Sequence, residues 1–268
     1  MVPTERSSRD RILVVGAGLR GLTAAARLAG HFRVQVVERG TRAGGESSAD
    51  DPAVGRMMME CDRAGVRFRL GETALRWHGG QLFISGTYGA GWVAADGLVL
   101  AGGTRPSSLA ELGVHGCRPT GVVPAPAAIA LLQEGARLGQ RPLILGSGVW
   151  AQAASSALER SGAVVRQLTY DPSDRIVVRG RRRVEGVELE RSARRVTFEC
   201  DLLVLAARPV PMRCVQGAVF PPVASALFLD EPREPDARVR DVVSHVGSEV
   251  ARFEEALKFR SAQTRPSA

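Results

Sequence analysis

The sequence predicts an α/β fold in which two parallel sheets form two domains, the second inserted into the first. An apolar strand, a glycine-rich turn, a helical pattern and a second strand follow one another over residues 11–38, and the same order recurs over residues 141–168. Two further apolar strands, 98–106 and 202–211, each end in small residues followed by proline. Strands that alternate with helices and carry nearly continuous apolar runs form parallel sheets. The repetition therefore predicts one fold used twice.

Length and composition agree with two domains. The chain has 268 residues, of which 44% are hydrophobic and 24% are charged. At roughly 100–200 residues per domain, this length gives one or two compact units. The apolar content also excludes disorder as the dominant state. We expect the first domain to comprise residues 1–106 and 213–268, with the second domain, residues 107–212, between its halves.

The first glycine-rich turn has the full context of a dinucleotide-binding motif. It follows the strand 11–15 and opens a helix that runs through Leu28. Gly16 permits the tight turn, Gly18 lets backbone approach a pyrophosphate, and Gly21 lets the helix pack closely on the strand. The helix N-terminus then offers N–H groups and a partial positive charge to the phosphates. The residues expected at this site are Gly16, Gly18, Leu19, Arg20, Gly21, Glu38 and Arg39.

Glu38 and a later glycine pair indicate which nucleotide binds there. Glu38 ends the strand 34–37, about 20 residues after Gly18, where a carboxylate accepts hydrogen bonds from both hydroxyls of an adenosine ribose. A carboxylate at this position disfavours a 2′-phosphate, so NADP is not expected. The pair Gly44-Gly45 follows shortly after and resembles the extension of an FAD-binding fingerprint, which favours FAD over NAD.

The middle of the chain contains one helix and several short strands. We expect a helix at 56–64 and strands at 66–70, 81–85 and 91–94. The apolar strand 98–106 then ends in small residues, which suits backbone passing close to a cofactor. The residues expected there are Ala101, Gly102 and Gly103.

The second glycine-rich turn lies between the strand 141–145 and a helix through Leu158. Ala151 at its third small position still allows helix and strand to pack closely. We expect a strand at 163–168 to complete the unit. The residues expected at this second site are Gly146, Gly148, Val149 and Trp150.

The ligand of the second turn stays open between several alternatives. NAD(H) or another adenine nucleotide is one, with Asp171, slightly late in the sequence, holding the ribose. A 2′-phosphate held by Arg166 is another. Trp150 is bulky and could restrict the nucleotide's approach, so a unit kept only as a scaffold is a third alternative.

Short strands at 175–178, 184–189 and 196–200 predict a small antiparallel layer, and residues 250–261 predict a final helix. Together the motifs resemble the pyridine-nucleotide–disulfide oxidoreductase superfamily, over most of residues 11–215. The segments that carry the resemblance are Gly16–Glu38, Gly44–Gly45, Leu98–Pro106, Gly146–Ala151 and Asp201–Pro211.

Within this superfamily, residues 111–122 and 143–151 look closest to the large FAD subunits of multi-subunit dehydrogenases. That group includes hydrogen cyanide synthase, opine oxidases, and the α subunits of heteromeric sarcosine oxidase and proline dehydrogenase. The resemblance implies two Rossmann-like domains and an FAD-dependent oxidoreductase subunit. It would pass electrons from an amine or amino-acid type substrate, oxidised here or on a partner subunit, to an acceptor. The expected partners are this small molecule and a second oxidoreductase subunit.

The chain departs from the superfamily at two places. The superfamily closes its FAD site with a late glycine-aspartate pair, and the matching zone here, residues 235–249, carries Gly247 followed by Ser248. We still expect Gly247 to lie at the cofactor. None of the four cysteines forms a CxxC pair, which excludes a dithiol disulfide reductase and gives no expectation of a metal site.

Charge and hydropathy exclude other classes. The net charge of +8 comes from scattered arginines with only 5% aromatic residues, so no nucleic-acid partner is expected. No apolar run reaches the roughly 18–20 residues of a membrane span, and residues 1–10 resemble no targeting signal. We expect a cytoplasmic protein whose only route to the inner membrane is a partner.

No catalytic residue is assigned from the sequence. Two alternatives to the dehydrogenase subunit stay open. One is a stand-alone NAD(P)H-dependent flavoprotein reductase, and the other is a non-catalytic nucleotide-binding scaffold.

Overall fold

The computed structural model describes residues 10–45, 51–87, 89–171, 173–192, 194–218, 225–229 and 239–264. The chain forms two compact units. Unit 1 contains the described residues within 1–104, 211–231 and 237–268, and unit 2 those within 105–210. Two short strands pair with each other at the points where the chain leaves and re-enters unit 1: β8 (Thr104–Arg105) and β17 (Val210–Pro211).

Unit 1 is built on a five-stranded sheet in which every neighbouring pair is parallel. Its strands, in sheet order, are β18 (Ala226–Phe228), β7 (Gly97–Leu100), β1 (Arg11–Val15), β2 (Arg33–Glu38) and β3 (Arg67–Leu70). Strand β1 lies in the centre because its apolar side chains are buried on both faces.

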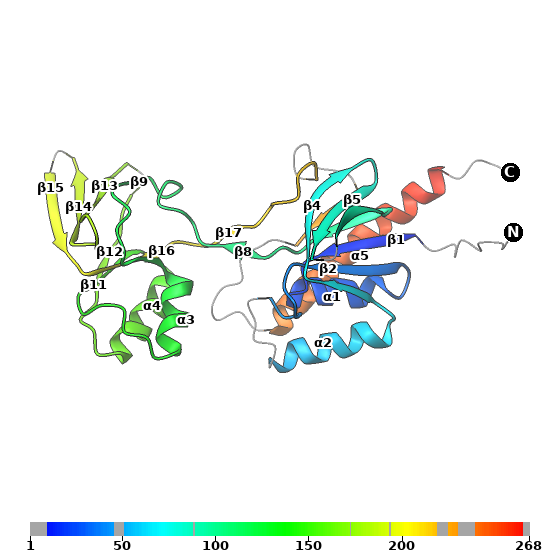
Figure 1. Ribbon diagram of the computed structural model, residues 1–268, viewed down its shortest axis with the longest axis horizontal. Helices are drawn as coiled ribbons and strands as arrows, with labels where there is room; N and C mark the ends of the chain where they lie inside the picture. Colours follow the sequence, from blue (N-terminus) through cyan, green and yellow to red (C-terminus); the bar gives the residue numbers. More distant parts are fainter. Residues whose placement is uncertain are drawn as a thin grey trace, which may run out of the picture. The chain divides into compact units, whose positions relative to one another are not determined.

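Different layers cover the two faces of this sheet (Figure 1). Helices pack on one face: α1 (Leu19–Leu28), α2 (Pro52–Arg63) and α5 (Val239–Thr264). An antiparallel meander packs on the other: β4 (Glu72–His78), β5 (Gln81–Gly86) and β6 (Gly89–Ala94). The start of α2 is fixed locally, because the Asp51 carboxylate accepts the Ala53 N–H at 2.8 Å and Pro52 occupies the first turn.

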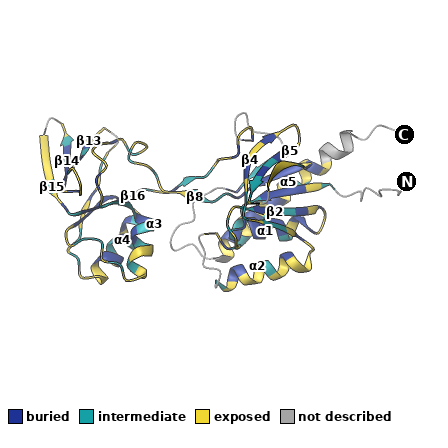
Figure 2. Cartoon of the chain, viewed as in Figure 1, coloured by how far each residue is buried: buried dark blue, intermediate teal, exposed yellow. Residues whose placement is uncertain are grey.

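Unit 2 repeats this layered design with a four-stranded parallel sheet. Its strands, in sheet order, are β10 (Val122–Pro124), β16 (Leu202–Ala206), β11 (Pro142–Gly146) and β12 (Arg166–Leu168). Two helices cover one face: α3 (Ala125–Gln133) and α4 (Val149–Arg160). A second sheet covers the other: β15 (Arg194–Glu199), β14 (Gly186–Arg191), β13 (Arg175–Arg179) and β9 (Val114–Gly116). Figure 2 shows the buried strands at the centre of each unit.

The predicted α/β fold with parallel sheets is confirmed, as is the antiparallel layer of β13, β14 and β15. Several elements differ from prediction. The expected elements omit helix α3 and the strands β4, β9, β10 and β18. The last helix begins at Val239, well before the predicted start at residue 250.

Candidate functional site

The first glycine-rich turn in unit 1 leaves no room for side chains at its two ends. The Gly16 N–H donates to the Val37 carbonyl at 2.8 Å, which joins the turn to β2. A Cβ on Gly16 would overlap the Ala101 carbonyl oxygen, and a Cβ on Gly21 would overlap the Gly16 carbonyl oxygen. The positive φ of 101° at Gly16 adds a second reason for glycine. The predicted roles of Gly16 in the turn and Gly21 in helix packing therefore have a direct steric basis.

The turn leads directly into the N-terminus of α1. Gly18 is the N-cap residue in an extended conformation, so no capping side chain stands between the first helical N–H groups and a ligand. Leu19 is buried and Arg20 is half-buried in the first turn of the helix. An uncapped N-terminus of this kind attracts anions through its N–H groups and the helix dipole.

The predicted glycine pair lies against this turn. The Gly44 N–H donates to the Ala17 carbonyl at 2.9 Å, and Gly44 forms a parallel bridge with Gly18. A Cβ on Gly45, where φ is 63°, would lie 3.0 Å from the Gly18 Cα. The main chain at Gly18 therefore lies beside the main chain at Gly44 and Gly45 with no side chain between them, which fits the close approach of a pyrophosphate to the backbone.

Glu38 faces the turn from the end of β2. One carboxylate oxygen accepts the Ala17 N–H at 2.7 Å, and the other accepts the Gly40 N–H at 2.7 Å. Each carboxylate oxygen can accept a further hydrogen bond, so the side chain keeps the capacity to bind ribose hydroxyls. The exposed Arg39 next to it places Nη1 3.6 Å from the Met212 sulfur.

The strand end after β7 closes the turn from the other side. The Ala101 N–H donates to the Val15 carbonyl at 2.8 Å, and its own carbonyl is the group that excludes a Cβ at Gly16. A Cβ on Gly102 would lie 2.9 Å from the Met212 carbonyl oxygen, and Gly103 accepts the Met212 N–H at 2.9 Å. The small residues predicted here are thus packed against backbone.

A cavity of about 450 Å³ opens beside the first turn of α1. Its walls are mainly apolar, and they come from the N-terminal parts of α1, α2 and α5. The lining residues are Leu19, Ala53, Arg56, Met57, Arg240 and Val243.

Unit 2 contains a second turn of the same kind between β11 and α4. A Cβ on Gly146 would lie 2.6 Å from the Ala206 carbonyl oxygen, which corresponds to the contact between Gly16 and Ala101 in unit 1. Gly148 is the N-cap of α4, and Val149 is its first helical residue. Gln167 on β12 donates from Nε2 to the Gly146 carbonyl at 3.0 Å.

The side chain of Trp150 packs against the apolar core between α3 and α4. Its indole Nε1–H is buried and has no hydrogen-bond partner among the described residues. A buried donor without a partner costs free energy, so it marks a point where an added acceptor would be favourable.

The Asp171 carboxylate binds a residue close to it in the sequence. Its Oδ1 accepts the Ser173 N–H at 2.9 Å and the Ser173 hydroxyl at 2.7 Å, within a local turn. These hydrogen bonds lower the pKa of the Asp171 carboxyl, the backbone bond most strongly. The sheet register identifies a different residue as the counterpart of Glu38. Val15 pairs with Val37 in unit 1, Leu145 pairs with Leu168 in unit 2, and the next residue is Thr169.

Residues 239–249, which belong to the zone expected to close the FAD site, lie in α5. Gly247 faces the opposite end of α1 from the glycine-rich turn: a Cβ on it would lie 2.8 Å from the Arg27 guanidinium carbon. Residues 235–238 lie outside the described residues. Strand β18 forms one edge of the unit 1 sheet, where it pairs with β7 and precedes Leu229. Because β7 is distant from it in sequence, no local pattern predicts this strand.

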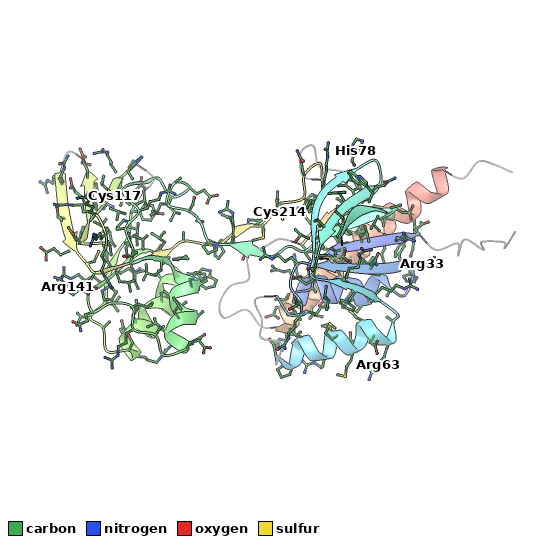
Figure 3. All side chains as sticks on the ribbon, viewed as in Figure 1. Arg33, Arg63, His78, Cys117, Arg141 and Cys214 are labelled. Atoms are coloured by element: carbon green, nitrogen blue, oxygen red, sulfur yellow. The ribbon has the colours of Figure 1, made fainter. Side chains whose placement is uncertain are left out.

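The described residues contain neither a candidate metal centre nor a helix that could span a membrane. No three His, Cys, Asp or Glu residues among them gather in a way that could hold a metal ion. No helix in the described part of the chain combines the length and apolar character needed to cross a bilayer. Exposed His78 lies at the end of β4, and Cys117 and Cys214 are also exposed (Figure 3).

Residues 14–76 match the family model of an NAD(P)-binding Rossmann-like domain. This range contains the first turn, Glu38, the glycine pair and α2. A comparison with curated proteins found no match.

Solved structures of several oxidoreductases share the fold. L-proline dehydrogenase from P. horikoshii is 15% identical with a TM-score of 0.56, and the match covers 93% of this chain and 58% of that one. A pyridine nucleotide-disulfide family oxidoreductase from Enterococcus faecalis V583 is 13% identical with a TM-score of 0.62, covering 92% and 69%. The Kutzneria sp. 744 ornithine N-hydroxylase KtzI, solved with FADred, NADP+ and L-orn, is 9% identical with a TM-score of 0.69, covering 94% and 100%.

The chain thus spans 58% of the proline dehydrogenase chain. At these identities the likeness is one of fold. The chain is an α/β protein in which residues 14–76 match an NAD(P)-binding Rossmann-like domain, and it shares its fold with a pyridine nucleotide-disulfide family oxidoreductase.

Proposed function

We propose that the chain is an FAD-dependent oxidoreductase subunit that binds FAD at the first glycine-rich turn of unit 1. The observation that carries the proposal is the packing of two glycine-rich segments, Gly16–Gly21 and Gly44–Gly45, backbone against backbone and beside the Glu38 carboxylate. Any side chain at Gly16 or Gly21 would collide with backbone. The geometry suits a dinucleotide whose pyrophosphate lies on main-chain amides.

Each predicted residue has a stated part in this proposal. The amides of Gly18, Leu19 and Arg20 face the pyrophosphate, and Glu38 accepts hydrogen bonds from the adenosine ribose. Bound FAD supplies the capacity to accept and pass on electron pairs, and the protein supplies its binding, position and electrostatic surroundings. Arg39, Gly44, Gly45 and the strand end Ala101–Gly103 form the remaining walls.

We propose an amine or amino-acid type small molecule as the electron donor, oxidised on this chain or on a second oxidoreductase subunit. Two solved structures with the same fold carry names that refer to amino acids, a proline dehydrogenase and an ornithine N-hydroxylase. The partner subunit follows from the resemblance to multi-subunit dehydrogenases, and it is part of the proposal.

A stand-alone NAD(P)H-dependent flavoprotein reductase is the second candidate function. It is favoured by the second turn, where Gly146 repeats the steric constraint of Gly16 and α4 begins at a glycine N-cap. In that case the electron donor is the nicotinamide nucleotide, which would bind in unit 2.

Absorbance spectroscopy of the purified protein tests both candidates. We expect a yellow protein with a flavin band near ~450 nm, and FAD in the supernatant after heat denaturation. Under anaerobic conditions, bleaching by secondary or primary amino acids supports the first candidate, and rapid bleaching by NADH or NADPH alone supports the second. A colourless protein that cannot be reconstituted with FAD contradicts both and leaves the nucleotide-binding scaffold.

A further inference from the structure

Strand β15 forms one edge of the second sheet of unit 2 (Figure 1). It pairs with β14 in continuous antiparallel register, and no other strand in the described part of the chain pairs with its second side. Most of its residues are exposed (Figure 2). An edge of this kind presents backbone N–H and C=O groups that can pair with a further strand. Its sequence, RRVTFE, contains neither the proline nor the glycine that would interrupt such pairing.

The register of β15 on β14 identifies the backbone groups that point outward. The Cys200 N–H donates to the Glu185 carbonyl at 3.2 Å, so these two residues form a hydrogen-bonded pair. Antiparallel ladders alternate between hydrogen-bonded and non-hydrogen-bonded pairs. The even-numbered residues of β15 therefore bond to β14, and the odd-numbered ones direct their N–H and C=O groups away from it. The outward set is Arg195, Thr197 and Glu199.

This edge is complementary to a second copy of itself. In an antiparallel pair of β15 strands with a two-fold axis at Thr197, Arg195 of each copy lies opposite Glu199 of the other. Every hydrogen-bonded pair in this arrangement joins outward-pointing residues, with two bonds per pair and about six in total. Val196 lies opposite Phe198 on the other face. A two-fold axis at Val196 or Phe198 would not bring the two opposite charges together.

The charged side chains on the outer face of β15 are accessible. The Arg195 side chain is 60% exposed and lies 2.8 Å from Glu188 and 3.6 Å from Glu190 on β14. The Glu199 side chain is 77% exposed and lies 3.4 Å from Arg141. In the paired arrangement, Glu199 of the second copy would approach Arg195 from the side opposite to these β14 carboxylates. The two rows of charges would then alternate in sign across the pair.

An apolar side chain on the inner face of β15 stays uncovered. Phe198 packs against the core of unit 2. Val196 points to the same face and is 49% exposed. Because the strand opposite would place Phe198 across from Val196, pairing would reduce the exposed apolar surface on both copies.

We propose that two copies of this chain associate through their β15 strands, which pair antiparallel about Thr197 and join the two sheets into one. Charges of both signs on this edge fit a second copy, whereas charges of one sign would keep two copies apart. A six-residue strand provides less contact area than the roughly 1,200–2,000 Å² of a standard stable interface. The dimer is therefore weak and reversible, with a dissociation constant of roughly 10–100 µM. It requires no ligand at either glycine-rich turn.

Sedimentation velocity of the full chain, from about 2 to 400 µM, tests the proposal. We expect a reversible change from monomer to dimer. Arg195→Glu and Glu199→Arg each place like charges opposite one another at both ends of the pair, so each should weaken the dimer by roughly tenfold or more. An equimolar mixture of the two variants has opposite charges at both ends and should associate as the unmodified chain does.

The matched control is Arg175→Glu on β13, away from this edge. Arg175 is also 60% exposed and also pairs with Glu190, at 3.4 Å, so the substitution changes the same charge on the same face. It should leave the dissociation constant unchanged. Thr197→Pro removes an outward N–H at the centre of the pair and keeps the bonds to β14, so it should abolish the dimer.

Hydrogen exchange of the unmodified chain decides the proposal even where a variant fails to fold. We expect the amides of Arg195, Thr197 and Glu199 to become protected as the concentration rises. A chain that stays monomeric, charge variants that each dimerise like the unmodified chain, or a mixture that does not regain association would overturn the proposal. A dimer in which these three amides exchange as fast as in the monomer would overturn it as well, since association would then use another surface.

Discussion

Glu38 serves the protein's own backbone as well as the proposed ribose. Its two oxygens hold the Ala17 and Gly40 amides at 2.7 Å each, which links the turn to the loop after β2. In the proposed complex, the two carboxylate oxygens that shape the turn would also accept the ribose hydroxyls. A substitution there should change folding stability and nucleotide affinity together.

Glu38→Gln tests this dual role. The amide nitrogen of Gln cannot accept a hydrogen bond, so one backbone amide loses its partner. Since hydrogen bonds to charged groups contribute about 1.5–3 kcal/mol, we expect a lower melting temperature and roughly tenfold weaker FAD binding. Circular dichroism and fluorescence titration of the apoprotein measure the two effects. Exposed Glu134→Gln is the control, and an unchanged FAD affinity in Glu38→Gln would contradict the ribose assignment.

Single residues of the first turn could be predicted from the sequence, and those of the second could only partly be predicted. Counting about 20 residues from the second glycine reaches Glu38 in unit 1 and Leu168 and Thr169 in unit 2, where the first acid that follows is Asp171. The register identifies Thr169 as the counterpart, so the search for an acid, and not the count, led to Asp171. The Thr169 carbonyl accepts a hydrogen bond from Arg191 on β14 at 3.3 Å, a contact between two sheets that no local pattern predicts.

Elements with a strong local pattern were predicted well. The strand, turn and helix units carry their signals within about 30 residues, as βαβ units do. Strand β18 has three half-buried residues and pairs with β7, which is distant in sequence. The first half of α5 carries a local signal of its own: Val242, Val246 and Val250 follow one another at helical spacing, and all three are buried.

The contact between the two glycine segments gives a prediction at the level of elements. Gly45→Ala places a Cβ 3.0 Å from the Gly18 Cα at a φ of 63°. We expect a loss of about 1 kcal/mol from the backbone conformation, plus weaker FAD binding as the two segments separate. Gly65→Ala is a matched control, because its φ is 73° and a Cβ there meets nothing within 4 Å. Chemical denaturation and FAD titration compare the two.

If both variants lose stability equally and bind FAD equally well, the close approach of Gly45 to Gly18 has no part in cofactor binding. Weaker binding in Gly45→Ala alone would attribute the effect to that contact. The comparison separates the free-energy cost of a side chain at positive φ from the effect of the Gly45–Gly18 contact on FAD binding.

At the scale of the whole molecule, one layered design is used twice with different local chemistry. Each unit has a parallel sheet, helices on one face and an antiparallel layer on the other. The repeated strand and turn patterns made this architecture predictable. The ligand preference of each unit is harder to predict from the sequence, because it depends on which side chains the tertiary structure brings to the sheet edge.

The pH dependence of unfolding follows from charged groups in both units. Arg105 lowers the pKa of Glu111 to about 2, and Arg191 lowers that of Asp174 to about 2. Burial raises the pKa of the Cys61 and Cys200 thiols to about 11. The carboxylates stabilise the folded chain above their ordinary pKa and lose this effect as the pH falls toward 2. The neutral thiols stabilise it below about pH 9, and this effect is lost as the pH rises toward 11.

We therefore expect the free energy of unfolding, measured by urea denaturation, to be highest between these limits and to fall on both sides. Salt distinguishes the two limbs: 1 M NaCl, with a Debye length of about 3 Å, should flatten the part of the acid limb that comes from the exposed Arg105–Glu111 pair and spare the alkaline limb of the buried thiols. Glu111→Gln should also reduce the acid slope, and Cys61→Ala the alkaline slope. A stability that does not change between pH 9 and pH 11 would contradict the raised thiol pKa values, because unfolding must release protons from thiols that burial keeps neutral.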